Sequence, residues 1–451
     1  MRGSIDMLHG PLSGGLFRFA IPVAFIGILQ QMFNTTDIFV LGRFVGTEAL
    51  AAMGNNAPVI GLLVNLFLGL SLGSNVLIAR FMGGRGDKES MDAIHTSFLL
   101  GILTGLFILV LGEVMAVPML QWLGVPPEIM DAAELYLRVF LLGMPGMTLY
   151  DFVSSIYRAH GNVRTPLLAL LVASLFNVAA DFAAVWLGTG LAGVVATTAL
   201  ANYVSSGLLI YMLRHGHGVL HLIPGAIRLH RPYVREILRI GLPAGVQGMV
   251  FNLANLVIQS AINSEGALAM AASAAAFVLE CNTYPFLVGF GQAITTFTSQ
   301  NYGAGNLARC RAVARRGTLL SFIFISILTG IVCVFAGPLL SLFGLTGEGL
   351  AIGKTRVWLV VGFYFVCSIY ESLSAALRGY GYSLPPALTM LVSICGVRLV
   401  WLATAYKAHP TFTYIMYCYP VSWSITAVLL VFLYRHYRDK IGREAEGADG
   451  K

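Results

Sequence analysis

Six ionisable side chains stand inside segments that are otherwise apolar, and they are the residues with the most chemistry to offer. They are Asp37, Asp151, Asp181, Glu280, Glu371 and Arg398. A charged side chain at the centre of a bilayer costs about 2.5–3.5 kcal/mol on insertion scales. If these segments cross a membrane, each of the six therefore requires a partner or a function.

The first and third of these carboxylates have neighbours at helical spacing. Gln30, Asn34 and Asp37 are separated by four and three residues, and Asn177 and Asp181 by four, so each set occupies one face of a helix. If the two faces meet, two carboxylates and several amide oxygens share a dry pocket. Such a pocket can coordinate a hard cation such as Na⁺ or hold a shared proton. A structural hydrogen-bond cluster is the alternative that the residues leave open.

Asp151 and Glu371 follow a different pattern. Each precedes an arginine by seven residues, Arg158 and Arg378 respectively. Seven residues are two helical turns, about 10.5 Å, on the same face. A feature that occurs twice in this form predicts symmetric architecture or gating rather than an ion site.

Glu280 and Arg398 leave several roles open. They could pair with each other, or Arg398 could pair with Glu371, and both would then be structural. Alternatively, Glu280 could attract a cationic substrate into a cavity.

The composition predicts that these segments do cross a membrane. Hydrophobic residues make up 57% of the 451 positions, charged residues 11%, and the mean hydropathy is +0.78. A soluble domain carries about 25% charged residues, so water cannot cover this surface on all sides. The net charge of +7 does not indicate nucleic-acid binding, because the basic residues stand in short loops between apolar runs.

Twelve segments are long enough to span about 30 Å of hydrocarbon. They centre on residues 16–40, 54–80, 93–117, 134–157, 167–187, 191–213, 237–262, 269–298, 317–338, 355–377, 386–406 and 412–434. Most basic residues follow the even-numbered spans, which predicts that both termini are cytoplasmic. The loops expected on the opposite side hold only Arg43, Arg138, Lys354, Arg356 and Lys407.

An internal repeat relates the two halves. LFRFAIP (16–22) matches ILRIGLP (237–243), and YRAHGNVRTP (157–166) matches LRGYGYSLPP (377–386), at shifts of 221 and 220 residues. We expect two six-helix lobes, as transporters use to form a central cavity and rock one lobe against the other. The expected divisions are an N-terminal lobe (1–213), a basic cytoplasmic linker (214–235), a C-terminal lobe (236–434) and a polar cytoplasmic tail (435–451).

The repeat does not preserve the first pair of acids. Ile258 and Trp401 occupy the positions that match Asp37 and Asp181. The cation site is therefore expected in the N-terminal lobe alone.

Several segments together resemble the multidrug and toxic compound extrusion (MATE) transporters over essentially the full chain. They are IP…QQMFNTTDIFVLGRFVGTEALAAMG (21–54), RAHGNVRTP (158–166), FNVAAD (176–181), TSQNYGAG (298–305) and LRGYGYSLPP (377–386). The resemblance implies export of organic cations in exchange for H⁺ or Na⁺, by an all-α protein whose two pseudo-symmetric six-helix bundles form a V-shaped central cavity.

Within that family the chain looks closer to the DinF-like branch than to the NorM-like branch. The match consists of Pro22, Gln30, Asn34, Asp37, Asn177, Asp181 and Glu280. Phe251 and Cys367 stand where NorM-like members carry acids. The resemblance implies that protonation of Asp37 accompanies bending at Pro22, and that Thr198 completes the cation site.

The sequence therefore predicts a secondary antiporter and not an enzyme. A lipid-linked oligosaccharide flippase of a related fold is the alternative, although such proteins line their cavity with several basic residues and only Arg398 is expected inside a span here. We expect a multi-pass monomer of a bacterial-type cytoplasmic (inner) membrane. Its expected partners are small organic cations and the bilayer, with no nucleic acid, no metal and no cofactor other than the coupling H⁺ or Na⁺.

Overall fold

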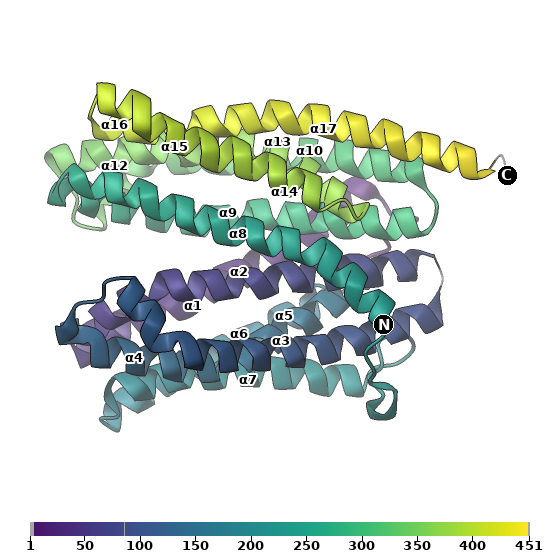
Figure 1. Ribbon diagram of the computed structural model, residues 1–451, viewed down its shortest axis with the longest axis horizontal. Helices are drawn as coiled ribbons and strands as arrows, with labels where there is room; N and C mark the ends of the chain where they lie inside the picture. Colours follow the sequence, from purple (N-terminus) through teal and green to yellow (C-terminus); the bar gives the residue numbers. More distant parts are fainter. Residues whose placement is uncertain (1–3, 85, 450–451) are drawn as a thin grey trace. The chain divides into compact units, whose positions relative to one another are not determined.

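The protein is helical almost throughout (Figure 1), in a computed structural model that describes residues 4–84 and 86–449. The elements of the N-terminal half are α1 (Leu12–Val40), η1 (Leu41–Val45), α2 (Thr47–Gly83), α3 (Asp87–Trp122), α4 (Pro127–Leu142), α5 (Met144–Ala159), α6 (Arg164–Trp186), α7 (Gly190–Arg214) and η2 (Pro224–Ala226). Those of the C-terminal half are α8 (Arg231–Ser264), α9 (Ala267–Gly303), α10 (Leu307–Val334), α11 (Ala336–Ser341), α12 (Gly347–Leu359), η3 (Val361–Phe363), α13 (Tyr364–Gly379), α14 (Leu384–Met390), η4 (Leu391–Gly396), α15 (Val397–Trp401), η5 (Leu402–Tyr406), α16 (Phe412–Met416) and α17 (Cys418–Asp449).

Within the described residues, eleven helical segments are long and apolar enough to cross a membrane, and a bent pair of helices brings the number to twelve. The predicted all-α, polytopic fold is therefore confirmed. The fourth span, expected as one helix over 134–157, is instead divided into α4 and α5, which meet at an angle of 40°. Pro145 stands in the first turn of α5, where a residue without an N–H is best tolerated, and so a new helix begins there.

The chain folds into two compact units whose boundaries differ from the expected lobes. Among the described residues, the first unit contains 4–5 and 25–245, and the second contains 6–24 and 246–449. Two helices thus change unit along their length. Helix α1 does so two residues after Pro22, and α8 two residues after Pro243, which is the repeat counterpart of Pro22.

The N-terminal parts of α1 and α8 each pack closely against a helix of the unit to which they belong. In the first unit a Cβ on Gly69 of α2 would overlap the backbone of Gly241 and Gly245 in α8. In the second unit a Cβ on Gly289 of α9 would overlap the backbone of Ala20 in α1. Gly69 and Gly289 match at the 220-residue shift of the repeat. The same small residue therefore permits the same close helix crossing in both units.

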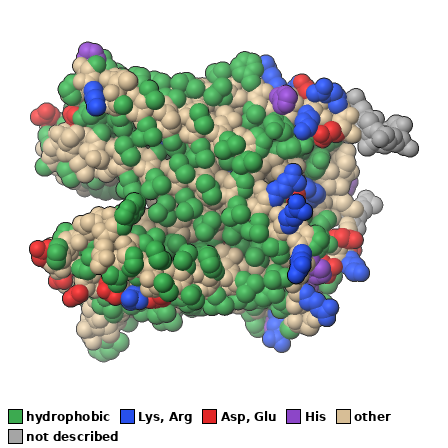
Figure 2. Space-filling model, viewed as in Figure 1, with side chains coloured by type: hydrophobic (Ala, Val, Ile, Leu, Met, Phe, Trp, Pro, Cys, Tyr) green, Lys and Arg blue, Asp and Glu red, His purple; other side chains and the backbone are tan. Residues whose placement is uncertain are grey.

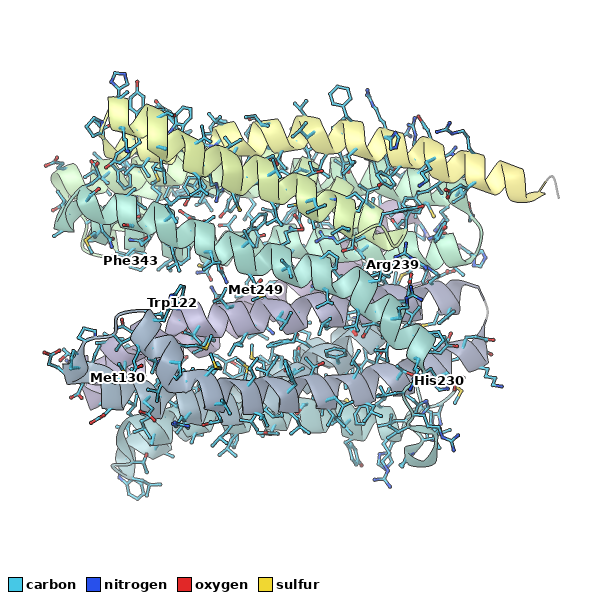
Figure 3. All side chains as sticks on the ribbon, viewed as in Figure 1. Trp122, Met130, His230, Arg239, Met249 and Phe343 are labelled. Atoms are coloured by element: carbon cyan, nitrogen blue, oxygen red, sulfur yellow. The ribbon has the colours of Figure 1, made fainter. Side chains whose placement is uncertain are left out.

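The predicted linker, 214–235, belongs to the first unit. It lies against α3, where the Ile223 N–H donates to Nε2 of His95 at 3.0 Å and Thr96 Oγ1 donates to the Arg228 carbonyl oxygen at 3.1 Å. Figure 3 shows His230 and Arg239 at one end of this unit and Trp122 and Met130 at the other. Of the predicted polar tail, residues 435–449 continue helix α17.

The surface of each unit fits a lipid environment. Hydrophobic side chains cover most of the face shown in Figure 2, while Lys and Arg side chains gather toward one end of each unit. Large exposed apolar residues occur along the helices, for example Val114, Leu175 and Ile327. A surface of this kind is stable against hydrocarbon rather than water, so the chain is a multi-pass integral membrane protein.

Candidate functional site

The polar faces predicted on α1 and α6 meet in the first unit. Thr198 of α7 joins them, because its Oγ1 donates to the Asp37 carboxylate at 2.8 Å from Oδ2 and 3.1 Å from Oδ1. The same Oγ1 accepts from Asn177 Nδ2 at 3.1 Å. Asn177 Nδ2 also lies 3.4 Å from Asp181 Oδ1. We call these four residues, together with Thr197, the acid cluster.

The two carboxyl groups of the acid cluster are joined by one chain of hydrogen bonds through Thr198 and Asn177. Thr197 Oγ1 donates to Asp181 Oδ1. Asp37 is 4% exposed and Asp181 and Asn177 are 0% exposed. In the described part of the chain, no Lys, Arg or His forms an ion pair with either acid, so the negative charge is balanced by hydrogen bonds alone.

Two oxygen atoms of the acid cluster are buried and lack a hydrogen-bond donor among the described residues. They are Asn177 Oδ1 and Asp181 Oδ2. A proton shared between the two carboxyls would give Asp181 a donor, and a hard cation such as Na⁺ would take both oxygens as ligands. The unsatisfied atoms therefore fit either form of positive charge.

The local helix geometry determines where the acid cluster lies. Asn177 and Asp181 are one turn apart on α6, and Thr197 and Thr198 lie close to the start of α7. Asp37 stands eight residues before the end of η1, about 12 Å along a helix axis at 1.5 Å per residue. η1 is a π-helical turn that ends at Gly46, whose φ is 134°. Such turns are frequent at functional sites, and the residue pattern did not predict this one.

Two residues predicted alongside Asp37 lie apart from its contacts. The Asn34 side chain is exposed, and the Gln30 side chain is partly exposed. Within the described residues neither side chain hydrogen-bonds to the acid cluster. The shared helix face extends from Gln30 to Asp37, but only its last residue joins the pocket.

The two intramembrane glutamates of the second unit, Glu280 and Glu371, both have arginine partners. Glu280 of α9 forms two hydrogen bonds with Arg356 of α12: Nε to Oε1 at 2.5 Å and Nη2 to Oε2 at 3.0 Å. Arg356 Nη1 also donates to Ser273 of α9. Arg356 was expected in a loop and is instead 4% exposed within a spanning helix. Of the roles left open for Glu280, a pairing with Arg398 is therefore excluded.

Glu371 is paired within its own helix, with the arginine that follows it by seven residues. Arg378 Nη2 lies 2.7 Å from Glu371 Oε1, so the alternative pairing of Glu371 with Arg398 is also excluded. In the first unit, Asp151 and Arg158 have the same spacing on α5, but they form no ion pair among the described residues, and the buried Oδ2 of Asp151 has no hydrogen-bond donor there. The aspartate side chain is shorter by one methylene than the glutamate at the matching position.

Arg398 makes only neutral contacts in the described residues. Its Nη1 donates to Asn255 Oδ1 at 3.2 Å and its Nε donates to Ser422 Oγ at 3.3 Å. Its guanidinium lies 4.3 Å from the ring centre of Tyr419 and 5.7 Å from that of Trp423. Neither of the two acids considered as its partners from the sequence pairs with it.

The chain also matches a known protein family. The sequence model of the MatE family matches twice, over residues 22–183 and 243–404. Each match begins at one of the two prolines where α1 and α8 change unit.

Similar curated proteins and solved structures agree with that match. The chain is 24% identical to the probable multidrug resistance protein YoeA of Bacillus subtilis over 93% of this chain and 92% of that protein. It is 27% identical to a probable multidrug resistance protein NorM of Thermotoga maritima over 85% and 83% of the two chains. A solved outward-facing multidrug resistance MATE transporter of the MOP superfamily superposes with a TM-score of 0.90 at 20% identity, covering 98% and 99% of the two chains.

Proposed function

The chain belongs to the MatE family, and on that premise we propose that it is a secondary active antiporter that exports organic cations or drugs in exchange for H⁺ or Na⁺ by alternating access. We place it in a bacterial-type inner membrane with both termini cytoplasmic, as a monomer. The relatives described above are named for multidrug resistance, so the lipid-linked oligosaccharide flippase is not favoured.

The acid cluster is the observation that carries the proposal. Two carboxyl groups are buried together in a membrane-spanning unit, and hydrogen bonds from Thr197, Thr198 and Asn177 hold them in place. A buried carboxylate without a basic partner gains most from binding a proton or a metal cation. The charge of the cluster then changes when the cation enters or leaves, which is the property that coupling requires.

Asp37 links this charge to a helix that two units share. The C-terminal part of α1 carries Asp37 in the first unit, and the N-terminal part belongs to the second unit. Pro22 interrupts the backbone hydrogen bonds of α1 just before the change of unit, and such an interruption is the usual cause of a helix bend. We propose that binding of the cation at Asp37 alters the bend at Pro22, and that Pro243 is the matching hinge in α8.

The test is transport by purified protein in lipid vesicles that carry one imposed gradient at a time. A pH gradient without Na⁺ and a Na⁺ gradient at clamped pH distinguish the two coupling ions. We expect uptake of a cationic dye against its gradient under one condition, loss of that uptake when the gradient is dissipated, and loss in Asp37→Asn.

Glu134→Gln is the matched control. This residue is an acid of the same unit that pairs with Arg138 outside the acid cluster, and its replacement is expected to keep coupled transport. Gradient-driven transport that persists in Asp37→Asn would overturn the role of Asp37. Absence of transport under both gradients in the wild-type protein would overturn the antiport itself.

A further inference from the structure

Arg398 is a buried cation without a buried anion to balance it. The side chain is 5% exposed, and among the residues that the structure describes no carboxylate forms an ion pair with it. The two intramembrane acids of the same unit form ion pairs with other arginines, Glu280 with Arg356 and Glu371 with Arg378. The positive charge of this guanidinium, which lies in a spanning helix, is therefore not balanced by an ion pair.

The contacts of Arg398 leave part of its donor set free. A guanidinium has five N–H groups in a planar fork, and here Nη1 donates to Asn255 and Nε to Ser422. Nη2 makes no hydrogen bond to a described residue, so its two N–H groups and the second N–H group of Nη1 have no acceptor there. Asn255, which holds the other side of the fork, is itself exposed. The charged group thus lies next to an accessible edge of the second unit.

Aromatic rings extend from Arg398 in a continuous series. The guanidinium lies over Tyr419 and Trp423. Trp423 contacts Tyr364 with ring centres 5.7 Å apart, and Tyr364 contacts Tyr284 at 6.1 Å. Tyr284 is 44% exposed, whereas the other three rings are buried. The series therefore ends in a partly exposed ring.

We propose that Arg398 and these rings form a binding site for an aromatic compound that carries a carboxylate or phosphate group. One free N–H group on Nη1 and one on Nη2 donate to the two oxygens of the acid, and the aromatic part of the compound stacks against Tyr284. The site rests on the proposed export function and selects, among exported aromatic compounds, those that carry an acid group.

The chemistry favours this occupant over a purely structural role. A fork of parallel N–H donors fits a carboxylate or phosphate better than it fits single neutral acceptors. An arginine that only filled a core would be neutralised, as Arg356 is by Glu280. The rings beneath Arg398 stabilise its charge until an anion arrives, since the face of an aromatic ring attracts a cation.

Direct binding to the purified full-length protein in detergent, without any ion gradient, tests the site. The probes are a rhodamine ethyl ester, which is a cation, and the corresponding free acid, which is a zwitterion of the same shape. Wild-type protein is expected to bind the free acid at least as tightly as the ester. Arg398→Gln is expected to weaken binding of the free acid about tenfold or more and to leave the ester within about threefold, because it removes hydrogen bonds to a charged group.

Arg398→Lys keeps the charge but not the fork, so an intermediate loss for the free acid is expected. Wild-type protein that binds the ester but not the free acid would overturn the proposal without any variant. Equal weakening of both probes in Arg398→Gln would assign Arg398 to structure and would also overturn it.

Anionic phospholipid is the other source of the same chemistry, and a competition arm separates the two. Phosphatidylglycerol micelles that abolish binding of the free acid at low concentration would assign the site to a lipid headgroup and overturn the substrate proposal. Because no gradient is present, these outcomes do not depend on whether export is coupled to H⁺ or Na⁺. Loss of free-acid binding with coupled export intact, or the reverse, identifies which of the two proposals has failed.

Discussion

The two units bury their acids in opposite ways. In the first unit Asp37 and Asp181 lie together and are held by two hydroxyls and an amide. In the second unit Glu280 and Glu371 each contact an arginine, and the excess charge of the described residues around Arg398 is positive. A neutral buried pair contributes to folding without needing a ligand, whereas an unbalanced group keeps an affinity for an ion of opposite sign. The difference indicates that binding occurs at the unbalanced groups, whereas the ion pairs have a structural role.

Removal of the two acids of the acid cluster gives the largest expected effect. Asp37→Asn and Asp181→Asn should each reduce coupled export to background. The double variant should be no worse than either single one, because two residues that act as one site are strongly non-additive. The measurement is gradient-driven dye uptake by vesicles for the complete mutant cycle. Independent, multiplying losses would mean that the two carboxyls do not share one ion.

Removal of one partner in the second unit should affect stability instead. Arg356→Gln leaves Glu280 buried without its cation, and a loss of about 3–5 kcal/mol is expected for breaking such a pair. Thermal unfolding in detergent measures the loss, and Asp37→Asn should show no comparable decrease. The matched control is the double variant Arg356→Gln with Glu280→Gln, which should recover most of the stability. If the single variant were fully stable, the contrast between the units would not hold.

The glycines at the helix crossings should respond alike in the two units. Gly69→Ala and Gly289→Ala each place a methyl group against the backbone of a neighbouring helix, and overpacking of this kind costs about 1–3 kcal/mol. The unfolding temperature of both variants should fall by similar amounts. Gly54→Ala, in an open position of α2, is the control and should not lower it. A decrease in only one unit would show that the N-terminal parts of α1 and α8 do not pack in equivalent ways.

The smallest expected effect concerns the hydroxyl that holds Asp37. Thr198→Val removes the donor to the carboxylate and the acceptor for Asn177, at about 0.5–1.5 kcal/mol for a hydrogen bond. Coupled transport under a limiting gradient should fall about two- to tenfold. Thr198→Ser keeps the hydroxyl and should retain most of the activity. Transport in Thr198→Val equal to that in wild type would show that Asp37 is positioned without Thr198.

Spacing along the chain was sufficient for features that depend on one helix or on composition. Hydropathy predicts the membrane spans, since a span needs only enough apolar residues in a row. The four-residue spacing in α6 places Asn177 beside Asp181, and the seven-residue spacing in α13 brings Arg378 to Glu371. The repeat and the family resemblance follow from residue order alone, and the MatE match over both halves supports them.

Contacts between helices required the folded structure. Arg356 was assigned to a loop by its place between apolar runs, yet α12 buries it opposite Glu280, 76 residues away in the chain. Thr198 reaches Asp37 across 161 residues. The exchange of α1 and α8 between units depends on which helices pack closely at Gly69 and Gly289. Helical periodicity defines the face on which a side chain lies, but only the packing of one helix against another defines what that side chain meets.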